Sequence, residues 1–396
     1  MSVEIEVKNV TKIFGKQISK AKKMASQEAS KEEILAKTGA TVGVDQASFK
    51  INRGELFVIM GLSGSGKSTM LRMINQLIPV TSGQILVEGK DLTKLGKKEL
   101  IEFRREKMSM VFQNFALLPH YTILDNVAFG LELQGIEKNE RLKKAKKALK
   151  IVGLSGYGTQ YPSQLSGGMQ QRVGLARALA SNTQILLMDE AFSALDPLNR
   201  KEMQDELLKI QSDLNKTIVF ISHDLNEALK LGDHIMIMRN GMVVQTGTPE
   251  EILTNPANDY VEKFIEEVDR TRVLTASNVM INPATVNIEK SGPRTALREM
   301  QANNTSSIYV VDNQRHFIGW ADASDVSNLI RKGSKDLKSV LMRNVPVAHP
   351  DTPLNELLSE VSTTQIPLAV LDEDSHLKGI IVRGAVLAAL AGDEVE

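Results

Sequence analysis

The stretch that most restricts how this chain can fold is a segment rich in glycine and serine, residues 61–69, with the sequence GLSGSGKST. It follows the apolar run 56–60 and precedes residues 70–74, which have helical character. A phosphate-binding loop of the GxxxxGK[ST] type needs this order of strand, loop and helix. The glycines let successive backbone N–H groups turn toward a polyphosphate, and the following helix directs its positive end to the same point. The alternative is an ordinary surface turn, which requires neither a strand before it nor a helix after it.

The loop supplies several groups for a nucleotide. Lys67 can reach the β- and γ-phosphates, and the Ser68 hydroxyl can bind Mg²⁺. The residues that we expect to contact the nucleotide are Gly61, Ser63, Gly64, Ser65, Gly66, Lys67, Ser68 and Thr69.

Composition limits the class of protein. With 396 residues the chain exceeds a single compact core, so two or three domains are expected. The 48 basic and 48 acidic residues balance, which gives no overall attraction to nucleic acid. There is no cysteine, so disulfides and thiolate metal sites are excluded.

The sequence also indicates how the chain relates to membranes. No basic region followed by an apolar region opens it, so we expect no signal peptide. No window reaches the ~18–20 apolar residues that are needed to cross a bilayer. A role at a membrane is therefore expected to depend on a partner.

Further polar segments suit phosphate chemistry. Residues 165–172, LSGGMQQR, open an alanine-rich helix and give a second helix N-terminus that can bind an anion. The apolar strand 185–188 ends in Asp189 and Glu190: one carboxylate can hold Mg²⁺ through water, and the other can polarise a water for in-line attack. A strand that starts at 217 ends in His223.

Several other elements are expected around these segments. A short buried strand from residue 108 ends on Gln113, and residues 120–160 form helices with Asp125 as an N-cap. The SALD segment 193–196 precedes an amphipathic helix from 200 to about 215. Between two strands, residues 16–40 form a helical insert, which is either a solvated helix or a docking surface.

Taken in order, the phosphate loop, Gln113, LSGGMQQR, the Asp-Glu strand end, SALD and His223 resemble the nucleotide-binding subunit of an ABC transporter. The resemblance covers residues 3–265. LSGGMQQR is its most specific motif, because P-loop kinases and GTPases lack it.

By this resemblance two copies would bind head to tail, with each nucleotide between two chains. The phosphate loop of one copy would hold the triphosphate, and Ser166, Gly167 and Gly168 of the other would close on the γ-phosphate. Such closure excludes water from the γ-phosphate and adds hydrogen-bond donors on its opposite side. Asp196 would organise the contact between the subunits.

The resemblance also assigns the chemistry. It places Mg²⁺ at Ser68, Gln113 and Asp189. Glu190 would orient or deprotonate the attacking water, while Lys67 and His223 contact the γ-phosphate. Phe14 matches the position where an aromatic ring stacks on adenine, although the insert directly after it departs from the commonest pattern.

Four segments resemble osmoprotectant importers for glycine betaine, proline betaine and related quaternary amines. These segments are 30–39, 57–64, 188–198 and 255–261. The resemblance implies an ATP hydrolase on the cytoplasmic face of the membrane, bound to a permease that is fused to or assisted by a substrate-binding protein. There are two alternatives: import of another small solute, or a soluble ABC ATPase of DNA repair or translation. The second lacks support because there is one cassette and no basic stripe for nucleic acid.

The C-terminal third contains two segments that echo each other. Each has a helix, a pair of short strands and a final helix, and together they resemble a tandem of CBS domains. In that family an aspartate near the start of the last helix often holds a ribose; Asp325 matches it in the first repeat, whereas Arg383 stands near that place in the second.

Three roles remain open for these repeats. They could bind an adenine nucleotide such as cyclic di-AMP, or form a purely structural dimerising tail. They could also sense ionic strength, if a basic cluster docks on anionic lipid until salt screens it. That cluster consists of Arg331, Lys332, Lys335, Lys338 and Arg343.

We therefore predict an α/β P-loop NTPase of the ABC cassette type, with a RecA-like core, an antiparallel β subdomain and a helical subdomain, followed by a tandem CBS α+β module. The predicted bounds are 1–265 for the cassette, 266–276 for a linker, and 277–333 and 336–396 for the two CBS domains.

Overall fold

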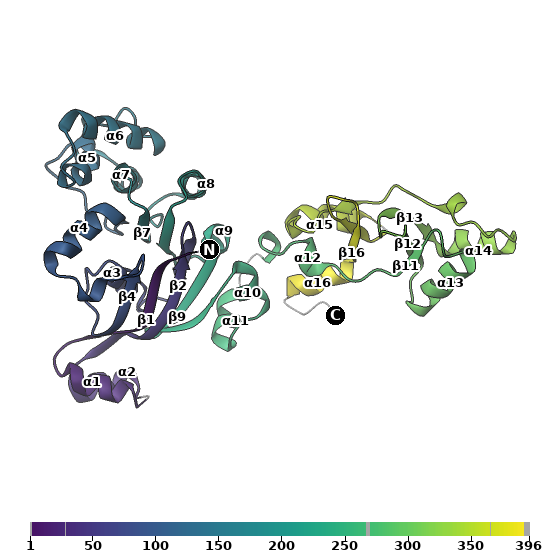
Figure 1. The fold of residues 1–396 in the computed structure, drawn as a ribbon, viewed down its shortest axis with the longest axis horizontal. Coiled ribbons are helices and arrows are strands. Elements are labelled where there is room, and N and C mark those ends of the chain that lie inside the picture. The colour runs from purple at the N-terminus through teal and green to yellow at the C-terminus, as the bar shows by residue number, and fades with distance from the viewer. Residues whose placement is uncertain (1, 28, 267–269, 365, 392–396) are drawn as a thin grey trace. The chain divides into compact units, whose positions relative to one another are not determined.

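The structure, a computed structural model, describes residues 2–27, 29–266, 270–364 and 366–391. The chain divides into two units, Met1–Glu267 and Val268–Glu396 (Figure 1). Among the described residues, none of the helices is both long and apolar enough to span a membrane.

Two sheets build the first unit. Six strands have the order β10-β9-β3-β8-β7-β6, parallel except for β10, and four antiparallel strands have the order β2-β1-β4-β5. Strands β3, β7 and β8 are buried along their whole length, as a parallel sheet covered on both faces requires. The strands are β1 (Val3–Phe14), β2 (Thr41–Asn52), β3 (Leu56–Met60), β4 (Ser82–Val87), β5 (Lys90–Asp91), β6 (Met108–Val111), β7 (Ile185–Asp189), β8 (Thr217–Ile221), β9 (His234–Arg239) and β10 (Met242–Gly247).

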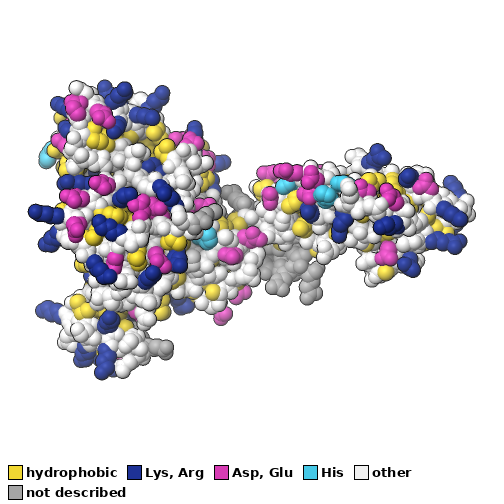
Figure 2. Space-filling model, in the orientation of Figure 1, with side chains coloured by type: hydrophobic (Ala, Val, Ile, Leu, Met, Phe, Trp, Pro, Cys, Tyr) yellow, Lys and Arg dark blue, Asp and Glu magenta, His cyan; other side chains and the backbone are white. Residues whose placement is uncertain are grey.

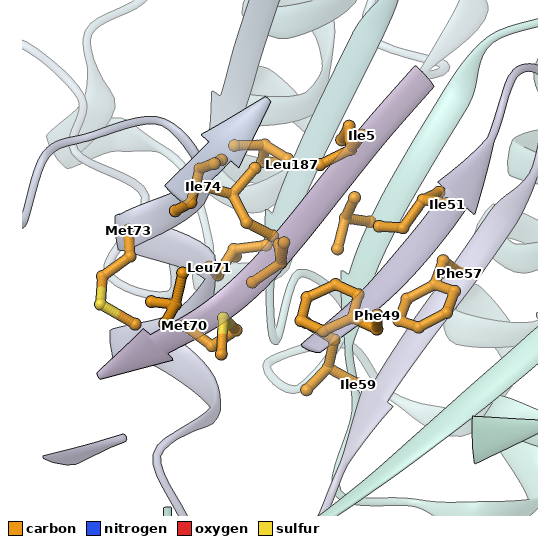
Figure 3. Close-up of a cluster of buried hydrophobic side chains, with 14 of the residues drawn as sticks. Ile5, Phe49, Ile51, Phe57, Ile59, Met70, Leu71, Met73, Ile74 and Leu187 are labelled. Carbon is orange, nitrogen blue, oxygen red and sulfur yellow. The ribbon is translucent and has the colours of Figure 1, made fainter. Parts of the chain in front are cut away.

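The core of this unit lies between the two sheets around helix α3 (Figure 3). Met70 and Leu71 of α3 are fully buried in one cluster with Ile5 of β1. The Phe49 and Phe57 rings stack with their centroids 5.5 Å apart and join β2 to β3. Burial of each such side chain stabilises the fold by roughly 1.5–3 kcal/mol, so the helix that follows the phosphate loop is held firmly.

Helices α5, α6 and α7 gather into a separate group, the predicted helical subdomain (Figure 1). The prediction of Asp125 as N-cap is wrong: Thr122 caps α5, and its Oγ1 accepts the Asp125 N–H at 3.1 Å. The helix expected from residue 200 begins at Pro197, because Asp196 caps it and proline suits a first helical position. The helices of the first unit are α1 (Ile18–Ala25), α2 (Lys31–Thr38), α3 (Lys67–Ile74), α4 (Lys97–Lys107), α5 (Ile123–Leu133), α6 (Lys138–Ile151), α7 (Gly167–Ala180), α8 (Pro197–Leu214), α9 (Leu225–Leu231), α10 (Pro249–Thr254) and α11 (Asp259–Ile265).

The helical insert consists of two short helices, α1 and α2. Ser30 caps α2, and Gly39, with a φ of 63°, ends it. The insert packs on Ile13 and Val42 of the β1–β2 hairpin. Since neighbouring strand residues point to opposite faces, Phe14 lies on the face away from the insert.

The second unit confirms the internal repeat. Two three-stranded sheets, β11-β12-β13 and β14-β15-β16, each combine one parallel with one antiparallel pairing. His316 and His376 occupy equivalent positions, and their rings stack 4.6 Å apart. The elements are α12 (Ala276–Val279), β11 (Thr285–Asn287), α13 (Pro293–Ala302), β12 (Ser307–Val311), β13 (Phe317–Asp322), α14 (Ala323–Arg331), β14 (Val347–Ala348), α15 (Leu354–Thr363), β15 (Leu368–Leu371), β16 (Leu377–Ile381) and α16 (Arg383–Ala391).

The end of the predicted linker is part of this unit. Leu274 and Ala276 are buried in one cluster with Leu354 and Leu368 of the second repeat. Their apolar side chains gain from leaving water. Folded structure therefore begins before residue 277, and the segment that precedes the first repeat packs on the second.

Candidate functional site

The phosphate loop joins β3 to α3. Gly61, Gly64 and Gly66 have φ values of 141°, 77° and 103°. A Cβ on Gly61 would lie 2.2 Å from the Met238 carbonyl oxygen, and one on Gly66 would lie 2.6 Å from the Gly43 carbonyl oxygen. Both the backbone conformation and the close approach therefore require glycine at these two positions.

Lys67 and Ser65 show that this loop fits a polyphosphate. The Lys67 ammonium donates to the Gly61 and Leu62 carbonyl oxygens at 2.7 and 3.1 Å. Burial lowers the pKa of Lys67, while Glu190 and Asp189 oppose that shift. The buried Ser65 hydroxyl has no partner among the contacts of the described residues. An anionic ligand in the loop would satisfy such donors.

Asp189 lies fully buried at the end of β7 and meets the first turn of α3. The Ser68 hydroxyl donates to Asp189 Oδ1 at 2.8 Å, and the Arg72 guanidinium donates to Oδ2 at 3.2 Å. The structure thus brings together two of the three predicted Mg²⁺ residues. Sequence reasoning missed Arg72, although its place one turn after Ser68 puts both side chains on the same helix face.

Gln113 and Glu190 form a second pair. The strand β6 ends at Val111, so Gln113 lies in an exposed loop beyond it, and its Nε2 donates to Glu190 Oε2 at 2.7 Å. This bond uses the Nε2 of Gln113 and leaves its side-chain oxygen without a partner in the pair. That oxygen, the Ser68 hydroxyl and the Asp189 carboxylate are all of the donor type that Mg²⁺ prefers.

The backbone of Glu190 is constrained. Its φ of 49° is unusual for a residue other than glycine. The Ser193 hydroxyl donates to the Glu190 carbonyl oxygen at 2.9 Å, and Gln171 Nε2 of α7 does so at 3.4 Å. These two contacts hold the backbone carbonyl of Glu190 in place.

His223 follows the buried Ser222 at the end of β8 and has an exposed side chain. It lines a small pocket together with Glu190, Ser193 and Arg200. The predicted histidine and the predicted catalytic carboxylate are therefore neighbours in space.

The LSGGMQQR segment forms the start of α7. Ser166 caps the helix, and its hydroxyl accepts the Met169 N–H at 3.3 Å. A Cβ on Gly168 would lie 3.1 Å from Leu195, so this helix start adjoins the loop that carries Asp196. Among the contacts described, none joins residues 166–168 to the phosphate loop of the same chain.

Asp196 has a local partner. It accepts the Asn199 N–H at 3.1 Å as the N-cap of α8. Its hydrogen bonds with Asn199 lower the pKa of the Asp196 carboxyl. Arg172 of α7 in turn donates to the Asn199 side chain, which ties the two helix starts together.

Phe14 ends β1 beside the phosphate loop. A Cβ on Gly43 would meet the Phe14 ring at 2.7 Å, and Gly43 itself contacts Gly66. Phe14 is 39% exposed, and an exposed aromatic side chain beside the loop can stack on a planar base. The Lys12 ammonium lies 5.0 Å from the ring centroid.

Arg177 is a second residue that sequence reasoning missed. From α7 it donates to the Phe115 and Ala116 carbonyl oxygens at 2.9 and 2.7 Å. Both of those residues have positive φ, 56° and 49°. Arg177 therefore holds the loop after Gln113 in a strained shape. An arginine in an alanine-rich helix was visible in the sequence, but its partners were not.

The two repeats differ at the position of the predicted ribose aspartate. Asp325 lies in the first turn of α14, which Asp322 caps. In the second repeat Arg383 donates to the Val361, Ser362 and Thr364 carbonyl oxygens at 2.9, 2.6 and 2.9 Å. Its guanidinium thus binds the end of α15, and a cation cannot accept a ribose hydroxyl as a carboxylate does.

The basic cluster is exposed throughout, at and after the end of α14. Figure 2 shows lysine and arginine side chains gathered over this end of the second unit. The cluster consists of Arg331, Lys332, Lys335, Lys338 and Arg343.

Comparisons with known proteins match both units. The ABC transporter family matches residues 44–193, and the CBS domain family matches residues 276–332 and 337–392. A glycine betaine/carnitine transport ATP-binding protein, GbuA of Listeria monocytogenes, is 62% identical over 99% of this chain and 98% of its own. The glycine betaine transport ATP-binding protein OpuAA of Bacillus subtilis is 55% identical over 99% and 93%.

A solved structure agrees with the first unit. The ATP-binding cassette MJ0796, a dimer in a post-hydrolysis state with ADP and Pi, is 34% identical over 62% of this chain and 98% of its own, with a TM-score of 0.54. The predicted fold class is confirmed. With relatives this similar over nearly its whole length, the chain belongs to the ATP-binding subunits of ABC transporters, in the group that carries two CBS domains at the C-terminus.

Proposed function

We propose that this chain is the ATP-hydrolysing subunit of an importer for glycine betaine or a related quaternary amine. The observation that carries the ATPase is the meeting of two pairs, Ser68 with Asp189 and Gln113 with Glu190, beside one phosphate loop. The substrate class is supported by the two relatives, whose names both include glycine betaine.

Each residue of the site has its own role in ATP hydrolysis. Lys67 exchanges its own loop carbonyls for phosphate oxygens when nucleotide binds. Glu190 accepts a proton from the attacking water, and Gln113 holds the carboxylate in place. Ser68, Gln113 and Asp189 would hold Mg²⁺, which would neutralise charge on the phosphates. His223 contacts the γ-phosphate from the next strand end.

The site is completed by a second copy of the chain. The start of α7 makes no described contact with the phosphate loop of its own chain, and MJ0796 is dimeric. In a head-to-tail pair, Ser166, Gly167 and Gly168 of one copy close on the phosphates held by the other, and Asp196 contacts the opposite chain. A membrane permease, with a fused or separate substrate-binding protein, positions the pair at the cytoplasmic face of the membrane.

Reconstitution tests this function. The chain and its permease are placed in liposomes, and ATP hydrolysis is measured with glycine betaine, with carnitine and without either. We expect glycine betaine to raise the rate at least as much as carnitine. Carnitine alone as activator would favour another solute, which the name of GbuA makes a specific alternative. Activation by nucleic acid instead would contradict the transport role.

The CBS pair is proposed to gate this activity through cyclic di-AMP or a related adenine nucleotide at Asp325. Because Arg383 stands in the second repeat where the first has Asp325, we expect one nucleotide site per CBS pair. Calorimetry with cyclic di-AMP on the full chain carrying Lys67→Ala, which weakens the cassette site, is expected to show this single site. Asp325→Ala should remove it, and two equal sites or no heat would contradict the proposal.

Ionic strength is the other proposed signal. If the basic cluster docks on anionic lipid, exchange of its five residues for glutamine should let transport start at lower salt, because the contact no longer needs screening. A matched control exchanges five exposed lysines of the cassette, Lys138, Lys143, Lys146, Lys147 and Lys150. Transport assays across a salt series in vesicles with and without anionic lipid measure the threshold. An unchanged threshold would refute lipid docking.

A further inference from the structure

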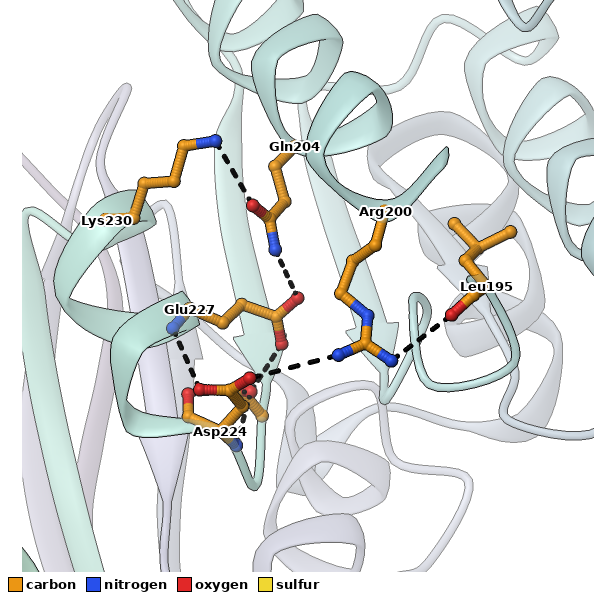
Figure 4. A network of polar contacts seen from close by, with 7 residues as sticks. Leu195, Arg200, Gln204, Asp224, Glu227 and Lys230 are labelled. Atoms are coloured by element: carbon orange, nitrogen blue, oxygen red, sulfur yellow. Dashed lines mark hydrogen bonds and ion pairs between the residues drawn. The ribbon is translucent and has the colours of Figure 1, made fainter. Parts of the chain in front are cut away.

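A polar network connects helix α8 with the loop that carries His223 (Figure 4). Within that loop the Ser222 hydroxyl accepts the Asp224 N–H at 3.0 Å. Asp224 caps α9 by accepting the Glu227 N–H at 3.3 Å. Among the described residues, none donates to or accepts from the His223 side chain, so its direction depends on how residues 222 and 224 are held.

Glu227 anchors one side of this loop. Its carboxylate accepts the Ser222 hydroxyl, and it accepts Gln204 Nε2 of α8 at 2.9 Å. The side chain is buried, and burial raises the pKa of the Glu227 carboxyl. Lys230 extends the network by donating to Gln204 at 3.2 Å. The loop is thus fixed to α8 on the side of Ser222.

Arg200 holds the other side. From the first turn of α8 its guanidinium donates to the Leu195 carbonyl oxygen at 3.2 Å and lies 3.9 Å from Asp224 Oδ2. Leu195 immediately precedes Asp196, and Asp224 immediately follows His223. One planar group therefore touches both loops through two separate nitrogens, in a fixed geometry that the single nitrogen of an ammonium does not provide.

We infer that Arg200 is a positioning residue that transmits contact of the second subunit at Asp196 to His223. The inference rests on the proposed function, in which Asp196 meets the opposite chain and His223 meets the γ-phosphate. When the opposite chain moves the loop at Leu195, the guanidinium moves with it and carries Asp224. His223 then reaches the γ-phosphate only when the second subunit is in place.

A double-mutant cycle on the full chain tests this. Arg200→Gln removes the bridge, and Asp224→Asn removes its charged partner while asparagine still caps α9. Each single variant is expected to lower kcat for ATP about tenfold with KM changed less than about twofold, which is the size typical of coupling between sites. The double variant should be no slower than either single one, because both break the same link.

Two controls make the result specific. Lys209→Gln removes an exposed cation of α8, nine residues beyond Arg200 and in contact with neither loop among the described residues, and should leave kcat within about twofold. Arg200→Lys, which keeps the charge but not the planar fork, should recover only part of the rate. ATP-dependent dimerisation should persist in Arg200→Gln.

Two other outcomes distinguish failure of the role given to Arg200 from failure of the proposed function. A wild-type rate in Arg200→Gln, or additive losses with a rise in KM, would overturn the role of Arg200 and leave the ATPase standing. Absence of ATP hydrolysis in the wild-type chain with its permease would overturn the proposed function, and the role of Arg200 with it.

Discussion

Glu190→Gln is expected to leave ATP binding intact and to lower turnover by about 10²–10⁴-fold, the usual contribution of a general base. The amide has the shape of the carboxylate, and its oxygen can still accept Gln113 Nε2, so the local structure is kept. It cannot take a proton from water. Single-turnover ATP hydrolysis and nucleotide binding by the purified chain measure the two effects separately.

The matched control is Glu202→Gln, a surface carboxylate on α8. It removes the same charge and should change neither measurement. Because bound ATP persists in Glu190→Gln, this variant should also accumulate as a nucleotide-dependent dimer. Turnover at the wild-type rate would refute the assignment of Glu190 as general base.

Much of the fold could be predicted because its signals are local. Five apolar residues before the phosphate loop, and the apolar run before Asp189, predict the buried strands β3 and β7. The repeat of helix, two strands and helix is likewise visible in the chain. One error came from incomplete use of a local signal. Thr122 and Asp125 have the capping spacing that marks a helix start, and this spacing makes the threonine the cap.

The contacts that shape the site were less predictable, since they join residues far apart in sequence. Asp189 and Ser68 were both predicted. Arg72 also donates to the Asp189 carboxylate, and this contact depends on how α3 packs on β7. The hydrogen bond from Arg177 to Ala116, in the loop after Gln113, joins residues 61 apart in sequence. Residue types identify the chemistry, whereas the packing of the elements decides which neighbours support it.

A second large effect is expected at the start of α7. Ser166→Asp keeps the N-cap, because aspartate caps as well as serine, so the fold should be unchanged. It also puts a carboxylate where the γ-phosphate of the opposite chain is to bind, and like charges at short range repel strongly. We expect ATP to bind the phosphate loop normally, while nucleotide-dependent dimerisation is lost and turnover falls by about 100-fold or more, the loss seen when a preorganised donor is removed. Ser155→Asp, an exposed serine before the same helix, is the control.

Mixing this variant with a phosphate-loop variant decides whether the site is shared between chains. Lys67→Ala alone and Ser166→Asp alone should both be inactive. In a head-to-tail pair of one chain of each kind, one site has both defects and the other has none, so hydrolysis should return to about a quarter of the wild-type rate at equal mixing, as the pairing symmetry requires. If each chain instead used its own α7, no chain in the mixture would have an intact site. No recovery, with mixed dimers demonstrated by differential tags, would therefore contradict the shared site.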